Sequence, residues 1–466
     1  MIRPIKIFLY FIIIALLVAL IDRGLGEAGI SLIPGSDLFA PADQPADTAI
    51  SLEISPEEEI AIKDSAVATE ASGSEDTVRQ EDLFVEDSLL TAPPSFRELF
   101  RTFSRKARQA GDQKSILRVL HIGDSQIEAD RITSVLRRQF REAYGGAGPG
   151  LIIPYDPMRI NAGVRLKNDG AWNLEYSYRE KQYPGKINFG FPGKVAWFKD
   201  KEAAFTIAPR SDEPSKIGEY SNIRLLTTSP ADTFQLKVSG NGGPMIDTII
   251  PPSDALQIQD FNLSYTPGEM TFRFSGSQSP LIHGLTLDGD NGVAVDNIPM
   301  RGRPWPGIRL ASEKMLKTTA RQLNIGLIIL QFGTNVLPTQ TDDYNFYRVH
   351  YHRELQRLQT ILPNVPVLVI GVQAAATVRN GKVEPLEHAA LISRAQKDAA
   401  LAFDMGFFDL HKAMGGENGA IQWAEDGLML SDYMHFSSDG ARKTGNKIWS
   451  ALNALKTDSL RNKDSN

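Results

Sequence analysis

The chain has 466 residues, a formal net charge of −6 and 42% hydrophobic residues. This length suggests two or three domains, and the hydrophobic content is ordinary for a globular protein. The negative net charge gives no sign of a basic surface that would bind nucleic acid. The absence of cysteine excludes disulfides, thiolate chemistry, Cys-based zinc sites and a lipid-modified N-terminal cysteine.

Residues 1–26 have the pattern of a signal peptide or a signal-anchor. Arg3 and Lys6 precede an apolar run, IFLYFIIIALLVALI. The run has about 15 residues, fewer than the roughly 20 that span a bilayer, and Gly26-Glu27-Ala28 is only a weak cleavage site. Because the positive flank stays cytoplasmic, the pattern predicts an exported, periplasmic or extracytoplasmic chain. Cleavage and retention as an inner-membrane anchor both remain open.

Residues 27–94 have the composition of a linker. They contain 16 acidic and two basic residues with scattered Pro, Ser and Ala. Such a segment buries too little apolar surface to fold by itself. We therefore expect a disordered acidic linker that acts as a spacer.

Two α/β segments flank a β-rich block. Residues 95–150 contain the buried strand pattern ILRVLHI at 116–122 and a helical pattern over 127–144. Residues 293–460 alternate strands and helices again, and the sequence IGLIILQF is typical of a strand buried on both faces. This alternation predicts a three-layer parallel sheet covered on both faces. The expected strands are 293–298, 325–332, 365–372 and 407–409, and the expected helices are 312–323, 343–362, 386–403 and 440–455.

Residues 151–292 predict an inserted β-sandwich. Short apolar or alternating stretches are punctuated by Gly, Pro, Asn and Ser, as in an antiparallel sandwich. Four aromatic residues in this block are suited either to stacking on sugars or to core packing: Trp172, Tyr176, Tyr178 and Trp197. The expected strands are 172–178, 187–191, 195–198, 204–207, 223–227, 234–238 and 270–274.

Four chemistry-bearing segments follow predicted strands of the α/β portion, where sites of open α/β sheets form. Ser125 stands between a strand and a helix, and Gly302 follows a strand in the sequence MRG. Asn335 follows IGLIILQF, and an amide there can donate to an oxyanion. Asp432 and His435 share the loop DYMH, so one segment supplies a base and the carboxylate that orients it. Each segment alone also fits an ordinary cap or turn.

Together, the ordered blocks HIGDSQ, MRG, FGTN and DYMH resemble those of the SGNH/GDSL hydrolase superfamily. The resemblance implies a flavodoxin-like α/β fold in which Ser125 is the nucleophile and His435 is the base, oriented by Asp432. It also implies an oxyanion hole formed by Ser125, Gly302 and Asn335. No metal or organic cofactor is implied.

Two departures from the usual pattern leave alternatives open. The third block reads GTN rather than the commoner GxND, which keeps Asn335 but changes its neighbour. Asp426 precedes the DYMH loop and is a second candidate for orienting the histidine.

The export signal and the inserted sandwich resemble those of envelope carbohydrate O-acetylesterases, including the peptidoglycan type. We therefore expect a serine esterase that acts on an acylated polysaccharide. Two alternatives remain: an acyltransferase working with a membrane-bound acyl-donor protein, and a noncatalytic glycan-binding protein.

Overall fold

The computed structural model describes residues 89–461 except 156–162, 180, 211–217, 230, 242, 340 and 342. Within these residues, no helix is both long and apolar enough to cross a bilayer. The expected N-terminal signal or anchor and nearly all of the expected linker lie outside the described residues.

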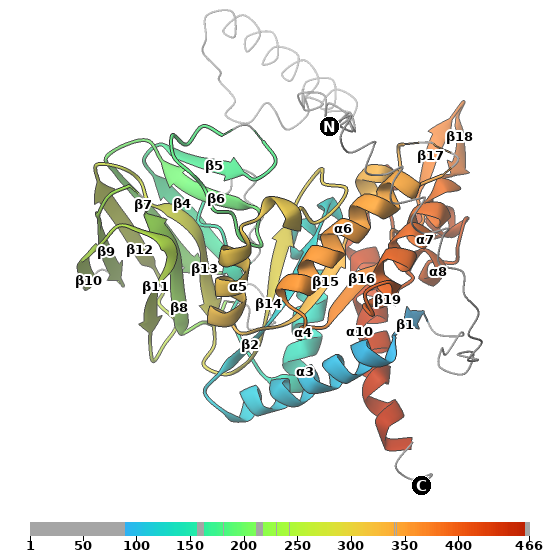
Figure 1. The fold of residues 1–466 in the computed structure, drawn as a ribbon, viewed down its shortest axis with the longest axis horizontal. Coiled ribbons are helices and arrows are strands. Elements are labelled where there is room, and N and C mark those ends of the chain that lie inside the picture. The colour runs from blue at the N-terminus through green and yellow to red at the C-terminus, as the bar shows by residue number, and fades with distance from the viewer. Residues whose placement is uncertain are drawn as a thin grey trace, which may run out of the picture. The chain divides into compact units, whose positions relative to one another are not determined.

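A six-stranded sheet forms the centre of the α/β portion, in the order β1-β19-β16-β15-β2-β14 (Figure 1). Five strands are parallel, and β1 pairs antiparallel with β19. In chain order the parallel strands lie 2-1-3-4-5, the flavodoxin-like order. The strands are β1 Leu90–Thr91, β2 Ile116–Gly123, β14 Gly292–Pro299, β15 Ile325–Gln331, β16 Val367–Ile370 and β19 Gly406–Phe408.

Helices cover both faces of this sheet because its strands are apolar on both sides. In β2, Leu117 and Val119 join a core with α3, α4 and α10, whereas Leu120 and Ile122 join a core with α5, α6 and α7. The helices are α3 Pro94–Asp112, α4 Thr133–Tyr144, α5 Glu313–Gln322, α6 Asn345–Ile361, α7 His388–Leu401, α8 Leu410–Ala413, α9 Gly419–Glu425 and α10 Ser438–Arg461. Short 3₁₀ turns are η2 Ser125–Asp130, η3 Ile308–Leu310 and η4 Thr334–Val336, and β17 Ala376–Arg379 forms a hairpin with β18 Lys382–Pro385.

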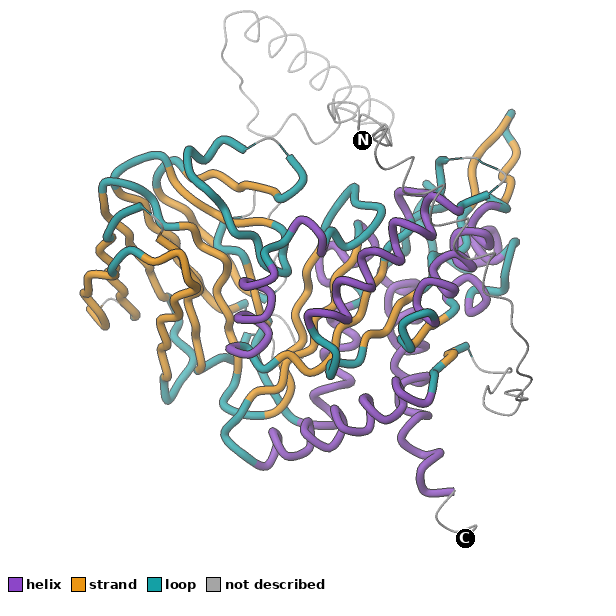
Figure 2. Tube along the Cα trace, in the orientation of Figure 1, coloured by secondary structure: helices purple, strands orange, loops and turns teal. Residues whose placement is uncertain are grey.

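Between α4 and β14 the chain forms two antiparallel sheets, which we call the insertion (residues 150–288). Its described residues form strands and loops (Figure 2). The sheets have the orders β10-β9-β12-β7-β4 and β11-β8-β13-β6-β5, and β3 also pairs with β13. The strands are β3 Gly150–Ile152, β4 Val164–Asp169, β5 Trp172–Tyr176, β6 Lys194–Phe198, β7 Glu202–Pro209, β8 Asn222–Ser229, β9 Phe234–Gly240, β10 Gly243–Ile250, β11 Ser253–Asn262, β12 Met270–Gly276 and β13 Leu281–Asp288. A parallel-stranded α/β sheet with additional antiparallel sheets confirms the coarse fold class expected from the sequence.

A buried ionic cluster links the insertion to the central sheet. The Arg118 guanidinium of β2 is bonded to Asp288 at the end of β13 and to Asp296 of β14. Asp296 also accepts the backbone N–H of Leu151 from β3 at 2.8 Å. All three charged side chains are at most 2% exposed, so removing one partner would leave a buried charge unpaired.

Three local expectations differ from the structure. The helix expected over 127–144 is divided into η2 and α4, because Ala129 and Asp130 have positive φ values of 53° and 62°. The stretch 187–191 forms no strand; its apolar residues Ile187 and Phe189 instead pack in a small cluster with Trp197. Strand β1 lies inside the range assigned to the linker, where it pairs with β19.

Candidate active site

Ser125 lies where β2 ends and η2 begins. Its neighbour Asp124 caps η2, and the Asp124 side chain accepts the N–H of Gln126 at 3.0 Å. As the first residue of the turn, Ser125 has an N–H that is not needed for helical bonding. The residue is only 8% exposed. The strand therefore delivers a nearly buried serine to the carboxyl edge of the sheet.

The loop before α10 brings His435 onto Ser125. Ser125 Oγ and His435 Nε2 are 2.8 Å apart, and His435 Nδ1 is 2.7 Å from Asp432 Oδ2. The other Asp432 oxygen accepts the backbone N–H groups of Met434 and His435, both at 2.9 Å. One short loop thus supplies both the carboxylate and the imidazole and holds them within hydrogen-bonding distance of each other.

These hydrogen bonds stabilise the ionised form of Asp432. Partial burial acts to raise the pKa of Asp432, but the bonds from His435 and Met434 outweigh it and hold the pKa below its ordinary value. A carboxylate at this position requires His435 to carry its proton on Nδ1. The Nε2 atom is then free to accept a proton from the Ser125 hydroxyl.

Gly302 occupies a tight turn after β14. The N–H of Arg303 donates to the Met300 carbonyl at 3.1 Å, and Gly302 has a φ of 75°. A positive φ at the third residue defines a type II turn and favours glycine. Because Arg303 closes the turn, the Gly302 N–H is not used by the turn's own hydrogen bond. The Met300 N–H donates to the carbonyl of Gly123 at 2.7 Å, which fixes the turn beside the end of β2.

Asn335 lies in η4 and contacts this turn. Its Nδ2 donates to the Arg303 carbonyl at 3.0 Å, and an amide NH₂ retains a second donor hydrogen. The adjacent Thr334 N–H donates to Asp124 at 3.0 Å. Burial raises the pKa of Asp124 to about 6, against the opposing effect of the hydrogen bonds that it accepts. The structure therefore brings Gly302 and Asn335 together and connects both to the segment that carries Ser125.

Two glutamines, whose role the sequence reasoning missed, hold the histidine loop. The Gln126 side chain donates to the Met434 carbonyl at 2.6 Å and accepts the Phe436 N–H at 3.4 Å, so it binds the backbone on both sides of His435. Gln373 donates to the same carbonyl at 3.1 Å and to the Thr334 hydroxyl at 3.2 Å. Gln373 follows β16, so its position at a strand end was a signal available in the sequence.

The four aromatic candidates of the insertion separate into two pairs. Trp172 and Trp197 are each 6% exposed and belong to packed aromatic clusters. Tyr176 and Tyr178 are half-buried, and the Arg303 guanidinium lies 4.5 Å from the centre of the Tyr178 ring. A turn of the insertion therefore contacts the turn that contains Gly302.

Asp426 ends α9 and accepts a bond from Gln422 at 3.4 Å. The hydrogen-bond partner of the His435 imidazole Nδ1 is Asp432 instead.

No protein-family model matches the chain, and no curated protein matches it either. Among solved structures, a peptidoglycan O-acetylesterase has a TM-score of 0.62 at 19% identity, covering 79% of this chain and 99% of that chain. An acetyl xylan esterase has a TM-score of 0.26 at 19% identity, covering 34% and 81% of the two chains. A family two carbohydrate esterase from Cellvibrio japonicus has a TM-score of 0.21 at 11% identity, covering 63% and 98%.

Of these three, only the peptidoglycan O-acetylesterase combines coverage of 79% of this chain with a TM-score above 0.5. The chain therefore shares the fold of this peptidoglycan O-acetylesterase.

Proposed function

We propose that the chain is a serine esterase that removes O-acetyl groups from a cell-envelope or extracellular polysaccharide. The observation that carries this proposal is the continuous hydrogen-bonded row from Ser125 through His435 to Asp432. A serine becomes a nucleophile when a base accepts its proton, and the carboxylate stabilises the resulting imidazolium.

The reaction then proceeds in two acyl transfers. His435 Nε2 takes the Ser125 proton while Oγ bonds to the acetyl carbonyl carbon, and the negative charge moves to the carbonyl oxygen. The N–H groups of Ser125 and Gly302 and the Asn335 amide are the proposed oxyanion donors. Each such donor is worth about 3–4 kcal/mol in the transition state.

Collapse of this intermediate breaks the bond to the sugar oxygen, which leaves as a hydroxyl with the proton held by His435. Water then attacks the acetyl-Ser125 ester, with His435 accepting its proton and returning a proton to Oγ. The products are acetate and free enzyme, so His435 acts as base and acid in turn.

Support for a carbohydrate substrate comes from the fold. The chain has the architecture of a peptidoglycan O-acetylesterase, and Tyr176 and Tyr178 of the insertion lie half-buried at the turn that contacts Arg303. Export by the N-terminal segment would bring the enzyme to such a substrate. We also propose the division into α/β segments 95–150 and 293–460 around the inserted sandwich.

Acetate release tests the proposal. We expect the wild-type chain to release acetate from 4-nitrophenyl acetate and from acetylated xylan or acetylated peptidoglycan, and Ser125→Ala to lose at least about 10³-fold of this activity. Ser253→Ala, at a partly exposed serine that begins β11 in the insertion, is the matched control and should retain full activity.

Absence of acetate release from every substrate by the wild-type chain would contradict the hydrolase assignment. If a fluorophosphonate still labelled Ser125 in that case, a transferase would replace the esterase as the proposed activity. If no label were attached, the site would be a noncatalytic binding site.

A further inference from the structure

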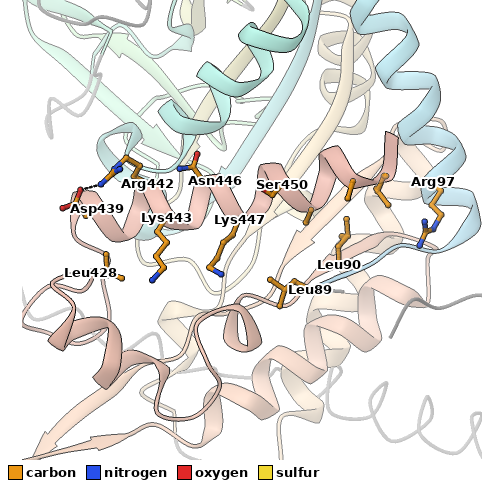
Figure 3. Close-up of a pocket in the computed structure, with 13 residues that line it drawn as sticks. Leu89, Leu90, Arg97, Leu428, Asp439, Arg442, Lys443, Asn446, Lys447 and Ser450 are labelled. Carbon is orange, nitrogen blue, oxygen red and sulfur yellow. Dashed lines mark hydrogen bonds and ion pairs between the residues drawn. The ribbon is translucent and has the colours of Figure 1, made fainter. Parts of the chain in front are cut away.

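A groove distant in sequence from Ser125 lies between the start of the described chain and α10. Its volume is about 790 Å³ (Figure 3). It is lined by Leu89, Leu90, Arg97, Leu428, Asp439, Arg442, Lys443, Asn446, Lys447, Ser450, Ala451, Ala454 and Leu455. The lining residues of α10 recur every three or four positions, so they form a single stripe along the helix.

The groove combines an apolar floor with a cationic rim. Its lining contains four cationic side chains and one carboxylate, Asp439, which is already bonded to Arg442 at 2.7 Å. Lys443 lies 4.8 Å from the centre of the Trp423 ring, and among the described residues Lys447 has no carboxylate partner. Figure 3 shows both lysine side chains extending from α10 toward the side on which Leu428 and Leu89 lie. An occupant that is acidic and partly apolar would complement this lining.

Residues 81–88 of the same chain have this composition. Their sequence EDLFVEDS has an apolar centre flanked by two acidic pairs. They lie outside the described residues and lead directly into Leu89, which itself lines the groove. The peptide bond to Leu89 keeps the segment within reach, so its effective concentration at the groove is high.

The lengths also agree. The stripe from Asp439 to Leu455 covers about 24 Å of helix, at a rise of 1.5 Å per residue. An extended segment covers this distance with about seven residues.

We propose that this groove binds residues 81–88 of the same chain, with the acidic pairs on the α10 cations and the apolar centre on the leucine and alanine floor. The folded enzyme then begins several residues before Leu89, and the linker leaves the α/β portion at the groove. This inference does not depend on the esterase activity.

The groove shares a wall with the loop that carries His435. Leu428 lines the groove, and its carbonyl accepts the Ser437 N–H at 3.0 Å. Two residues further on, the Leu430 N–H donates to the His435 carbonyl at 2.8 Å. A bound segment therefore supports one end of this loop.

Hydrogen–deuterium exchange of the full chain in detergent tests the proposal. We expect the backbone amides of 81–88 to be protected in the wild type, and to exchange about tenfold faster in Lys443→Glu/Lys447→Glu, since the ion pairs with both lysines are lost. Adding Glu86→Lys/Asp87→Lys should restore protection. Lys106→Glu/Lys314→Glu makes the same change of charge on α3 and α5, outside the groove, and should leave protection unchanged.

Three results would overturn the proposal. One is exchange of residues 81–88 at the rate of an open chain in the wild type. Another is protection that depends on protein concentration, which would assign the groove to a second copy. The third is protection that survives charge reversal in the lysines. The circular dichroism spectrum of each variant reports independently whether its fold is intact.

Discussion

Asp432 has two tasks that a neutral amide cannot perform together. One oxygen accepts two backbone N–H groups while the other accepts His435 Nδ1–H. In Asp432→Asn, the amide oxygen can keep the two backbone hydrogen bonds. The NH₂ group of the asparagine then faces His435 Nδ1. This favours the tautomer with its proton on Nε2, which cannot accept the proton of Ser125.

We therefore expect Asp432→Asn to reduce kcat for acetate release by about 10²- to 10⁴-fold. Asp426→Asn is the matched control, because Asp426 is exposed at the end of α9, and it should stay within about twofold of the wild type. Equal losses in the two variants would show that Asp426 takes part in orienting the histidine.

At this scale, the sequence predicted residues whose chemistry is visible in their type and position. Ser125 and Asn335 each follow a strand pattern, whereas the Asp432–His435 pair lies in the loop before α10. The structure brings His435 to Ser125 at the edge of the sheet where β2 ends. Gln126 was not recognised because its role depends on backbone groups some 308 residues away. No local pattern of residue types encodes such a bond.

At the scale of elements, η2 positions the loop before α10 through one side chain. Gln126 binds the backbone on both sides of His435, so we classify it as a positioning residue. Gln126→Leu removes both bonds and leaves the Met434 carbonyl to Gln373 alone.

We expect Gln126→Leu to lower kcat by about 10- to 100-fold with little change in KM, because the imidazole loses its alignment while the substrate contacts remain. Gln422→Leu on the exposed face of α9 is the control. A rise in KM at unchanged kcat would instead make Gln126 a substrate-binding residue.

The insertion contributes an element to the same edge. The Tyr178 ring supports Arg303, whose carbonyl holds Asn335. We expect Tyr178→Ala to reduce kcat/KM about 2- to 30-fold, for 4-nitrophenyl acetate as well as for acetylated glycan, as a lost cation–π contact implies. Tyr178→Phe keeps the ring and should retain activity.

Tyr265→Ala removes an exposed tyrosine elsewhere in the insertion and serves as the control. An effect of Tyr178→Ala on the glycan alone would mean that Tyr178 binds sugar and does not support the turn.

The order of the elements was predictable, but several boundaries were not. Periodicity over 127–144 indicates one helix, yet the buried Asp130–Arg137 ion pair accompanies a backbone with positive φ at Ala129 and Asp130. In the same way, 187–191 is apolar because it packs in a cluster, not because it pairs in a sheet. An apolar run indicates that a segment is buried. Tertiary contacts determine whether that segment forms a helix, a strand or a loop.

For the whole molecule, buried histidines set the response to acid. Burial lowers the pKa values of His121 and His283 to about 4 from an ordinary 6.5. Their stabilising contribution is complete above pH 6.5 and is lost as the pH falls toward 4, on the order of 3 kcal/mol for each. Asp124, with a pKa raised to about 6, acts in the opposite direction between pH 6 and 4.

Among the described residues, four histidines have lowered pKa values (His121, His283, His352 and His411), and three carboxyl groups have raised ones (Asp124, Asp296 and Glu354). Because the histidines outnumber the carboxyl groups that oppose them, we expect the Tm to fall between pH 6.5 and 4.5. His283→Gln should flatten this dependence, as measured by thermal unfolding across that range. An unchanged slope in the variant would show that His283 is protonated equally in the folded and unfolded chain.

The two segments that connect the insertion to the α/β portion lie against each other, and this contact bears on how the chain folds. Where the chain enters and leaves, the Val293 N–H donates to the Gly145 carbonyl at 3.1 Å, and a Cβ at Gly292 would lie 2.4 Å from the carbonyl carbon of Gly145. Strand β2 is synthesised before the whole insertion, whereas its neighbour β14 is synthesised after it. Closing so long a loop costs entropy that rises with its length. If the sandwich assembles first from its local hairpins, its two ends already meet at this contact, and β14 emerges beside β2. In that order of folding, the folded insertion brings the two halves of the α/β portion together and reduces the entropy lost when they pair.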